Sequence, residues 1–144
     1  MRGYTCIGLD NAKSPLNVGA ALRAAHCYQV AMVAISGKRY RSAVTDTFKT
    51  TRHLPLLQVD DLKTIIPYDC VPVAVDIVED ADPLMDYKHP ERAFYIFGAE
   101  DATLGERVLS YCRDQIYIPT DGCMNLAATV NVVLYDRMLK MRTA

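Results

Sequence analysis

Three segments of this 144-residue chain place polar side chains among apolar or small neighbours. In the first, Asn17 and Arg23 flank a run of small residues that includes Gly19. Asn17 can cap a helix, and Gly19 allows a ligand or another chain to approach closely. An arginine in such surroundings needs an anionic partner, and its planar fork fits a phosphate or a carboxylate. Arg23 therefore either binds a substrate phosphate or pairs with one of the chain's own carboxylates.

The second segment runs from Phe97 to Gly105 and begins where an apolar, strand-like run ends. Gly98 permits a tight turn, and Glu100 follows within the turn. Loops in this position bind ligands beyond the end of a strand, in part through backbone amides and carbonyls. Glu100 can also pair with Arg23. The segment is therefore a candidate ligand-binding loop.

The third segment runs from Ile118 to Asn131. A strand-like run ends at Pro119, a polar loop follows, and a helix is expected to begin near Asn125. Asn125 either caps this helix or orients a substrate. Cys123 lies just before the helix N-terminus, where a thiol can be activated, but we interpret it as a small neutral residue at a packed turn.

Short apolar runs alternate with helix-like stretches, which predicts an α/β fold with a largely parallel sheet flanked by helices. Ligand sites in such sheets lie beyond the carboxyl ends of strands, so the turns after Val75, Phe97 and Ile118 are expected to lie together. The predicted strands cover residues 4–9, 31–36, 54–59, 71–77, 93–97 and 115–118. The predicted helices cover residues 17–28, 60–66, 104–113 and 125–141, and residues 38–53 and 79–90 are expected to be connections.

Composition narrows the class of protein. No linker or internal repeat divides the sequence, so residues 1–144 are expected to form one domain. The sequence has no run of about 20 apolar residues and no signal peptide, so no membrane partner is expected. The five cysteines are widely spaced and form no CxxC pair, which argues against a disulfide framework and a zinc site. We expect a reducing cytoplasm as the location.

Charge is distributed unevenly along the chain. Residues 1–53 contain eight Lys/Arg and two Asp/Glu, for a net charge of +6, whereas residues 54–144 carry −7. A basic half can supply phosphate contacts while the whole chain stays near neutrality, although such an asymmetry can also arise by chance. No GxGxxG follows the first strand and no GxxxxGK[ST] occurs, so neither a dinucleotide-binding fold nor a P-loop enzyme is indicated.

In this order and at these separations, the three segments resemble the motifs of the SPOUT class of RNA methyltransferases, in its SpoU/TrmH branch. The family patterns are Asn-x-Gly-x-x-x-Arg, a Phe-Gly-x-Glu segment ending near Gly-Leu, and Ile-Pro followed by Ser-Leu-Asn-Val. The resemblance covers essentially the whole chain. It implies a SPOUT fold with a deep C-terminal trefoil knot, S-adenosylmethionine (SAM) as the methyl donor, RNA as the substrate and a homodimer.

The resemblance also implies roles for individual residues. Asn17, Arg23, Glu100 and Asn125 match the functional positions of the three motifs. The positions that hold the donor, largely through backbone groups, are Val75, Gly98, Ala99, Ile118, Cys123, Met124 and Ala127. Three departures stand out: Cys123 replaces a usual serine, Ala127 replaces a small polar residue, and Leu104-Gly105 replaces Gly-Leu.

The branch implies methylation of a ribose 2′-hydroxyl without a metal. By resemblance Arg23 aids activation of the hydroxyl, by holding the adjacent phosphate and stabilising developing alkoxide charge. Glu100 and Asn125 are expected to orient Arg23 and the ribose, whereas His26 and His89 are interpreted as structural. The basic stretch that is expected to contact RNA, with Tyr40 available for stacking on a base, comprises Lys38, Arg39, Tyr40, Arg41, Lys49, Arg52 and His53.

Several alternatives stay open at this point. The RNA is expected to be a tRNA by analogy with small members of the branch, but ribosomal RNA is also possible. An enzyme of the same fold can instead methylate a base nitrogen. The replacement at Cys123 also leaves room for a catalytically weak module that binds SAM or RNA.

Overall fold

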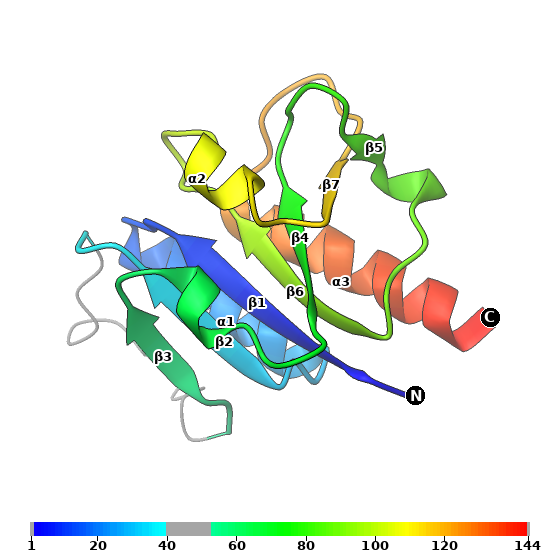
Figure 1. Ribbon diagram of the computed structural model, residues 1–144, viewed down its shortest axis with the longest axis horizontal. Coiled ribbons are helices and arrows are strands. Elements are labelled where there is room, and N and C mark those ends of the chain that lie inside the picture. Colours follow the sequence, from blue (N-terminus) through cyan, green and yellow to red (C-terminus); the bar gives the residue numbers. More distant parts are fainter. Residues whose placement is uncertain (1, 40–52, 144) are drawn as a thin grey trace.

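The computed structural model describes residues 2–39 and 53–143, and it contains one sheet covered by helices (Figure 1). The strands are β1 (Tyr4–Asp10), β2 (Met32–Ser36), β3 (Leu56–Val59), β4 (Val71–Val75), β5 (Asp82–Pro83), β6 (Arg92–Phe97) and β7 (Asp114–Tyr117). The helices are α1 (Pro15–Cys27), α2 (Glu106–Leu109) and α3 (Leu126–Thr143), with the 3₁₀ turns η3 (Leu62–Ile65) and η4 (Leu84–Asp86).

The strands form a sheet in the order β3-β2-β1-β6-β4-β7-β5. All strand pairs within the described residues are parallel, which confirms the prediction of a largely parallel sheet. A parallel sheet is covered on both faces, so its inner strands are apolar throughout. In β6, for example, every residue from Ala93 to Phe97 is buried.

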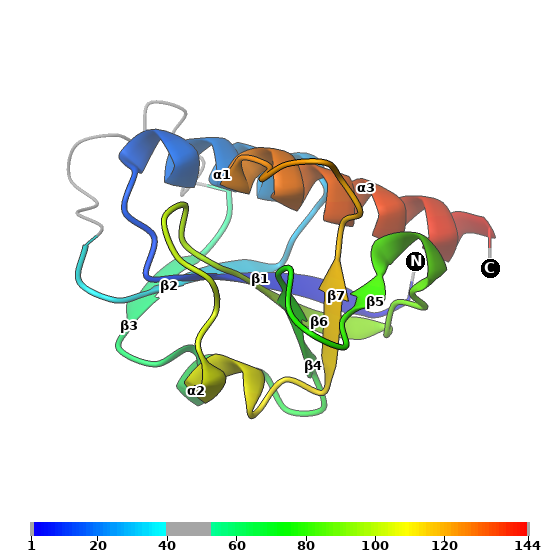
Figure 2. The same ribbon diagram turned by 90° about the horizontal axis from the view of Figure 1, so that it is seen from above.

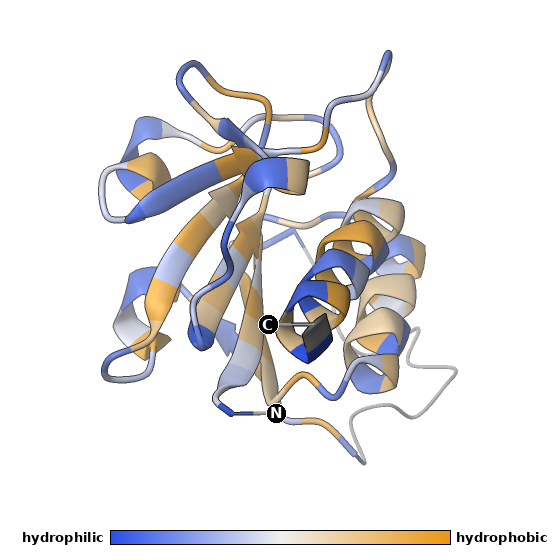
Figure 3. Ribbon diagram, turned by 90° about the vertical axis from the view of Figure 1, so that its right-hand side faces the viewer, coloured by the Kyte–Doolittle hydropathy of each residue, from blue (hydrophilic) through white to orange (hydrophobic). Residues whose placement is uncertain are grey.

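Helices cover both faces of the sheet in three layers (Figure 2). Helices α1 and α3 pack side by side on one face, where Leu22 and Val130 belong to the larger hydrophobic cluster. Helix α2 and η3 lie on the other face, where Leu62 and Val108 belong to the second cluster. Hydrophobic residues are concentrated in the sheet between these layers (Figure 3). The fold is therefore the expected α/β arrangement.

One predicted strand ends earlier and one predicted helix begins later than expected, both beside the carboxylate of Asp76. Strand β4 stops at Val75 rather than at residue 77, since Asp76 accepts a hydrogen bond from the N–H of Ile77 (2.7 Å). The N–H of Leu104 also donates to Asp76 (2.6 Å), and helix α2 begins only at Glu106. The helix predicted over residues 104–113 is therefore wrong at both ends.

The segment of residues 79–90, expected to be only a connection, holds the short strand β5 and the turn η4. Strand β5 has two residues, too few for an alternating pattern to be visible in the sequence. Residues 40–52 of the predicted basic connection lie outside the described part of the chain. The trefoil knot and the single domain stay predictions.

A buried polar network fixes helix α3 to the central strand β6 and to the segment that precedes it. Arg137 is 3% exposed and donates to the carbonyl of Pro90 (2.6 Å) and to the hydroxyl of Tyr95 (3.2 Å). The two ring nitrogens of His89 lie 2.6 Å from the Tyr95 hydroxyl and 2.7 Å from a carboxylate oxygen of Asp136. His89 is therefore structural, as expected.

Candidate functional site

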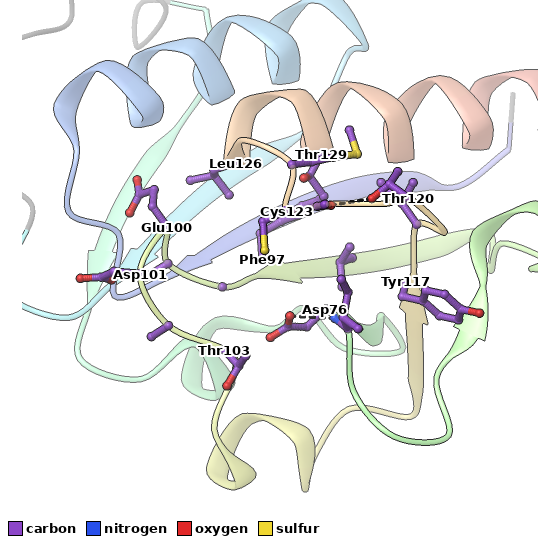
Figure 4. Close-up of a pocket in the computed structure, with 18 residues that line it drawn as sticks. Asp76, Phe97, Glu100, Asp101, Thr103, Tyr117, Thr120, Cys123, Leu126 and Thr129 are labelled. Carbon is purple, nitrogen blue, oxygen red and sulfur yellow. Dashed lines mark hydrogen bonds between the residues drawn. The ribbon is translucent and has the colours of Figure 1, made fainter.

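A cavity of about 500 Å³ opens beyond the carboxyl ends of β4, β6 and β7 (Figure 4). The turns after Val75, Phe97 and Ile118 supply its walls, and these three turns come together as the sheet topology predicts. Its lining residues are Val75–Ile77, Phe97–Thr103, Tyr117, Ile118, Thr120, Gly122–Met124, Leu126 and Thr129.

Most positions that were expected to hold the donor line this cavity. The six that do are Val75, Gly98, Ala99, Ile118, Cys123 and Met124. Ala127 does not; it is buried in the first turn of α3, where its N–H donates to the side-chain oxygen of Asn125 (2.9 Å). Cys123 is exposed at the cavity, so its interpretation as a residue packed in a turn is wrong.

Gly98 lies where the chain leaves β6 and folds back on itself. A Cβ atom at this position would lie 3.3 Å from the carbonyl oxygen of Ala102, which is tighter than most Cβ contacts. The absence of a side chain lets the loop close against its own backbone and keeps the backbone at the cavity wall accessible.

Three of the four residues expected to be catalytic form one hydrogen-bonded chain. The side-chain amide of Asn17 donates to a carboxylate oxygen of Glu100 (3.0 Å). The amide of Asn125 donates to the side-chain oxygen of Asn17 (2.9 Å). The other end of Asn125 accepts from the N–H groups of Ala127 and Ala128, so Asn125 caps α3 as one alternative predicted. The fold thus joins three segments that are distant in sequence.

The prediction that Asn17 caps α1 is wrong. The helix begins two residues earlier at Pro15, and Ser14 is its N-cap, with its hydroxyl accepting from the N–H of Asn17 (3.3 Å). A proline is tolerated in the first turn because that position needs no N–H. The side chain of Asn17 therefore remains available for Glu100 and Asn125.

Arg23 lies on the same helix as Asn17 and is exposed. Six residues of α-helix place it roughly 9 Å further along the axis. It is not among the residues that line the cavity. Glu100 receives its hydrogen bond from Asn17, and the expected pairing of Glu100 with Arg23 stays a prediction.

The described part of the basic stretch is tied to the cavity loop. Arg39 forms a two-pronged ion pair with Asp101 (2.8 and 2.9 Å) and donates to the carbonyl of Asn11. The hydrogen bond from Arg39 lowers the pKa of Asp101 to about 2. Lys38 is exposed, and His53 stacks on His26 with ring centroids 5.2 Å apart. Tyr40, Arg41, Lys49 and Arg52 lie outside the described residues.

Comparison with known proteins identifies the family. The sequence model of the SpoU rRNA Methylase family matches residues 4–135. The chain belongs to this family. The match includes all three motif segments and the whole sheet.

One relative of this SpoU-family chain is a ribosomal RNA methyltransferase. The chain is 25% identical over 142 residues to RlmB of Acinetobacter baylyi, a 23S rRNA (guanosine-2′-O-)-methyltransferase. The matched region covers 90% of this chain and 57% of RlmB. The chain therefore spans just over half of that relative's length.

Solved structures show the same fold. AviRb, a SpoU methyltransferase of Streptomyces viridochromogenes, superposes with a TM-score of 0.88 at 19% identity, covering 99% of this chain and 62% of AviRb. Its complex with AdoMet superposes with a TM-score of 0.85 at 18% identity, covering 100% and 63%. A structure concerned with 2-OH methylation of C/U34 on tRNA superposes with a TM-score of 0.82 at 19% identity. The superposition covers 99% of this chain and 93% of that chain.

The SpoU-family cavity contains carboxylates that sequence reasoning did not single out. Asp76 and Asp101 line it together with Glu100, and the described lining residues include no Lys, Arg or His. Asp76 comes directly after a buried strand at the sheet's carboxyl edge, which is the signal that could have identified it. Asp101 is already paired with Arg39, so the carboxylates left beside the apolar lining are those of Asp76 and Glu100.

Neither a metal-binding cluster nor a membrane-spanning helix occurs within residues 2–39 and 53–143. No group of three or more His, Cys, Asp or Glu side chains there is arranged to hold a metal ion. None of the helices found there has the length and apolar character needed to cross a membrane.

Proposed function

We propose that this SpoU-family chain transfers the methyl group of SAM to the 2′-hydroxyl of a ribose in RNA. The observation that carries the proposal is the placement of the hydrogen-bonded side chains Asn125–Asn17–Glu100 beside a cavity of about 500 Å³ at three strand ends. Glu100 belongs to both features, since it lines the cavity and accepts from Asn17. The cavity holds the donor, and the hydrogen-bonded chain marks where the acceptor ribose lies.

The cavity matches the chemistry of SAM. Its lining combines apolar groups such as Val75 and Ile118 with three carboxylates, and SAM combines an adenosine with a sulfonium cation and an ammonium group. Backbone groups at Gly98 and Ala99 are available to the donor because these side chains are small. The AviRb complex with AdoMet shows that this fold accommodates the donor in that relative.

When bound, SAM supplies a methyl group whose bond to sulfur breaks as the ribose oxygen attacks, and sulfur leaves as a neutral thioether. The protein must hold the ribose hydroxyl in line with the bond between methyl and sulfur, and this orientation contributes to the rate. The hydroxyl must also lose its proton, which passes to solvent as the oxygen–carbon bond forms. An arginine side chain stays protonated, so Arg23 acts by holding the adjacent phosphate and stabilising negative charge on the oxygen rather than as a base.

The substrate that we favour is a tRNA. The tRNA-related structure matches this chain over 93% of its own length, whereas RlmB, a 23S rRNA enzyme, is matched over 57%. Lys38 and Arg39 begin the basic stretch, which we propose as the RNA contact together with Tyr40, Arg41 and Arg52. Methylation of ribosomal RNA or of a base nitrogen is distinguished from this by the modified nucleoside and its position.

We also propose a homodimer in the cytoplasm. Val132 and Tyr135 lie three residues apart on α3 and are 37% and 52% exposed, so they present an apolar surface that a second copy can cover. The five cysteines are free thiols, which fits a reducing compartment. Sedimentation of the purified chain tests the dimer, and a monomer at micromolar concentration would contradict it.

The decisive variants are Arg23→Ala and Arg23→Lys. We expect Arg23→Ala to lower methyl transfer to tRNA by about a hundredfold or more, because a stabiliser of transition-state charge is lost. Arg23→Lys restores the charge without the planar fork and is expected to recover only part of the rate. Calorimetric titration with SAM is expected to give the wild-type affinity for both.

Two results would contradict the proposed function. Full activity of Arg23→Ala would remove Arg23 from the mechanism. Binding of SAM by the wild type without methyl transfer to any RNA would favour a catalytically weak binding module.

A further inference from the structure

Asp76 is the first residue after β4, and its hydrogen bonds reach strand β7 and the loop that follows β6. Its own N–H donates to the carbonyl of Ile116 in β7 (3.0 Å). One carboxylate oxygen accepts from the N–H of Ile77 (2.7 Å), and the other accepts from the N–H of Leu104 (2.6 Å). The carboxylate turns toward the loop that carries Thr103, as Figure 4 shows.

The bond to Leu104 closes the loop of residues 98–104, most of which lines the cavity. Within this loop, the backbone hydrogen bond from the N–H of Ala102 to the carbonyl of Ala99 is long, at 3.4 Å. The bond from Leu104 to Asp76 is much shorter and charge-assisted, and such bonds are roughly twice as strong as neutral ones. It joins residues 28 apart in sequence, and thereby ties two walls of the cavity together.

We infer that Asp76 is a positioning residue for the methyl donor, which sets the loop of residues 98–104 at the distance from β4 that the donor requires. The inference rests on the proposed function, because it takes SAM as the occupant of the cavity. Each carboxylate oxygen accepts a backbone N–H, and the role that we assign to Asp76 is to hold the loop rather than to contact the donor.

A direct electrostatic role predicts a different result, because Asp76 lines the cavity and could attract the sulfonium. S-adenosylhomocysteine (SAH) separates the two roles, since its thioether sulfur is neutral and the rest of the molecule is the same as SAM. If Asp76 positions the loop, its replacement weakens both ligands equally. If Asp76 acts by its charge on sulfur, SAM is weakened more than SAH.

Two variants at position 76 and one control make the test. Asp76→Asn replaces one acceptor oxygen by an N–H₂ group that faces a backbone N–H, so one hydrogen bond is lost and the charge is removed. Asp76→Glu keeps the charge but moves the carboxylate by one methylene. The control is Asp80→Asn, which removes the same charge from the connection between β4 and β5. Asp80 is exposed, and its positive φ of 66° suits asparagine.

The experiment is calorimetric titration of the purified full chain and its variants with SAM and with SAH, with thermal melting to verify folding. We expect Asp76→Asn to weaken both ligands about tenfold, which is the loss of one hydrogen bond to a charged group. Asp76→Glu is expected to weaken both by several-fold despite its charge. Asp80→Asn is expected to match the wild type.

Hydrogen exchange gives a readout that does not depend on the ligand. The amide of Leu104 is expected to exchange faster in Asp76→Asn than in the wild type or in Asp80→Asn, because its acceptor is weakened. The amide of Ile96, inside β6, is expected to be unchanged.

The outcomes separate this inference from the proposed function. If the wild type binds neither SAM nor SAH, the proposed function fails and the inference fails with it. If the wild type binds SAM but Asp76→Asn binds it equally well, or loses SAM alone and keeps SAH, only the inference is overturned. Wild-type affinity of Asp76→Glu for both ligands would also overturn it.

Discussion

At the scale of single residues, the candidate site depends on two side-chain amides that use both of their ends. Asn125 accepts from the first N–H groups of α3 and donates to Asn17, which in turn donates to Glu100. The orientation of each amide is therefore fixed by its neighbours. The sequence identifies all three residues by type and spacing. It does not reveal that their side chains bond to one another, because it predicts that the side chain of Asn17 caps α1, a role that Ser14 fills instead.

The central position of Asn17 leads to a prediction. Asn17→Ala removes a hydrogen bond to the carboxylate of Glu100 and one to Asn125, and we expect kcat to fall by about ten- to a hundredfold. The affinity for SAM is expected to stay within about twofold, because Asn17 does not line the cavity. Single-turnover methylation and calorimetry measure the two effects.

Asn131→Ala is the matched control for this variant, since within the described residues Asn131 donates to the carbonyl of Ala127 in its own helix. Equal losses of activity in the two variants would contradict a specific role for Asn17.

A second prediction at this scale concerns the ion pair between Arg39 and Asp101. Arg39→Ala removes the largest cause of the low pKa of Asp101, so this pKa is expected to rise from about 2 toward its ordinary value of 3.8. Lys13 lies 3.8 Å from the same carboxylate and is expected to keep the pKa of Asp101 partly lowered. An NMR titration of the Asp101 carboxyl measures the change.

Lys13→Ala provides the comparison, with a smaller expected rise. A larger rise in Lys13→Ala than in Arg39→Ala would show that Arg39 does not hold the carboxylate in solution.

At the scale of elements, the sequence predicts long buried strands well and short or capped elements poorly. The apolar run of β6 is visible as a strand because all five residues from Ala93 to Phe97 are buried. Strand β5 and helix α2 are too short for periodicity to be recognised. The end of β4 and the start of α2 lie beside the contact between Asp76 and Leu104, which joins residues 28 apart and which no local pattern contains.

The prediction at this scale concerns the buried His89, which contacts Asp136 of helix α3. Burial lowers the pKa of His89 below its ordinary value of 6.5, although Asp136 opposes the shift. The unfolded chain therefore binds a proton at a higher pH than the folded chain does. The free energy of unfolding is expected to decrease as pH falls from about 7.5 to about 5.5.

His89→Gln is expected to flatten this pH dependence and to lower stability at neutral pH by about 1–3 kcal/mol, since hydrogen bonds of the network are lost. Denaturant unfolding across the pH range measures both effects. His26→Gln, at an exposed residue of α1, serves as the control. A steeper slope in His89→Gln than in the wild type would contradict the assignment.

At the scale of the whole molecule, the parallel sheet explains why distant motifs act together. Strands β4, β6 and β7 are neighbours in the sheet although other elements separate them in sequence, so their carboxyl ends form one cavity. Helices α1 and α3 pack on one face, which brings Asn17 and Asn125 to the same edge. The sequence predicts this edge as the site but not the distances within it, because those depend on side-chain packing.

The charge distribution also belongs to this scale. The basic first part of the chain, residues 1–53, approaches the cavity through Arg39, which is bound to Asp101 of the cavity loop. RNA phosphates that contact this part would therefore lie close to the donor. On the proposed function, this arrangement would let a chain with a net charge of −1 bind RNA at one edge.

The measurement that tests the central claim most directly is analysis of the nucleosides formed when the purified chain, methyl-labelled SAM and unmodified tRNA are incubated together. We predict label in a single 2′-O-methylated nucleoside, which protects the adjacent phosphodiester from alkaline cleavage, and its loss in Arg23→Ala. Label in a methylated base would contradict the assignment to the ribose. No label in tRNA or in ribosomal RNA, with SAM bound, would contradict the proposed activity itself.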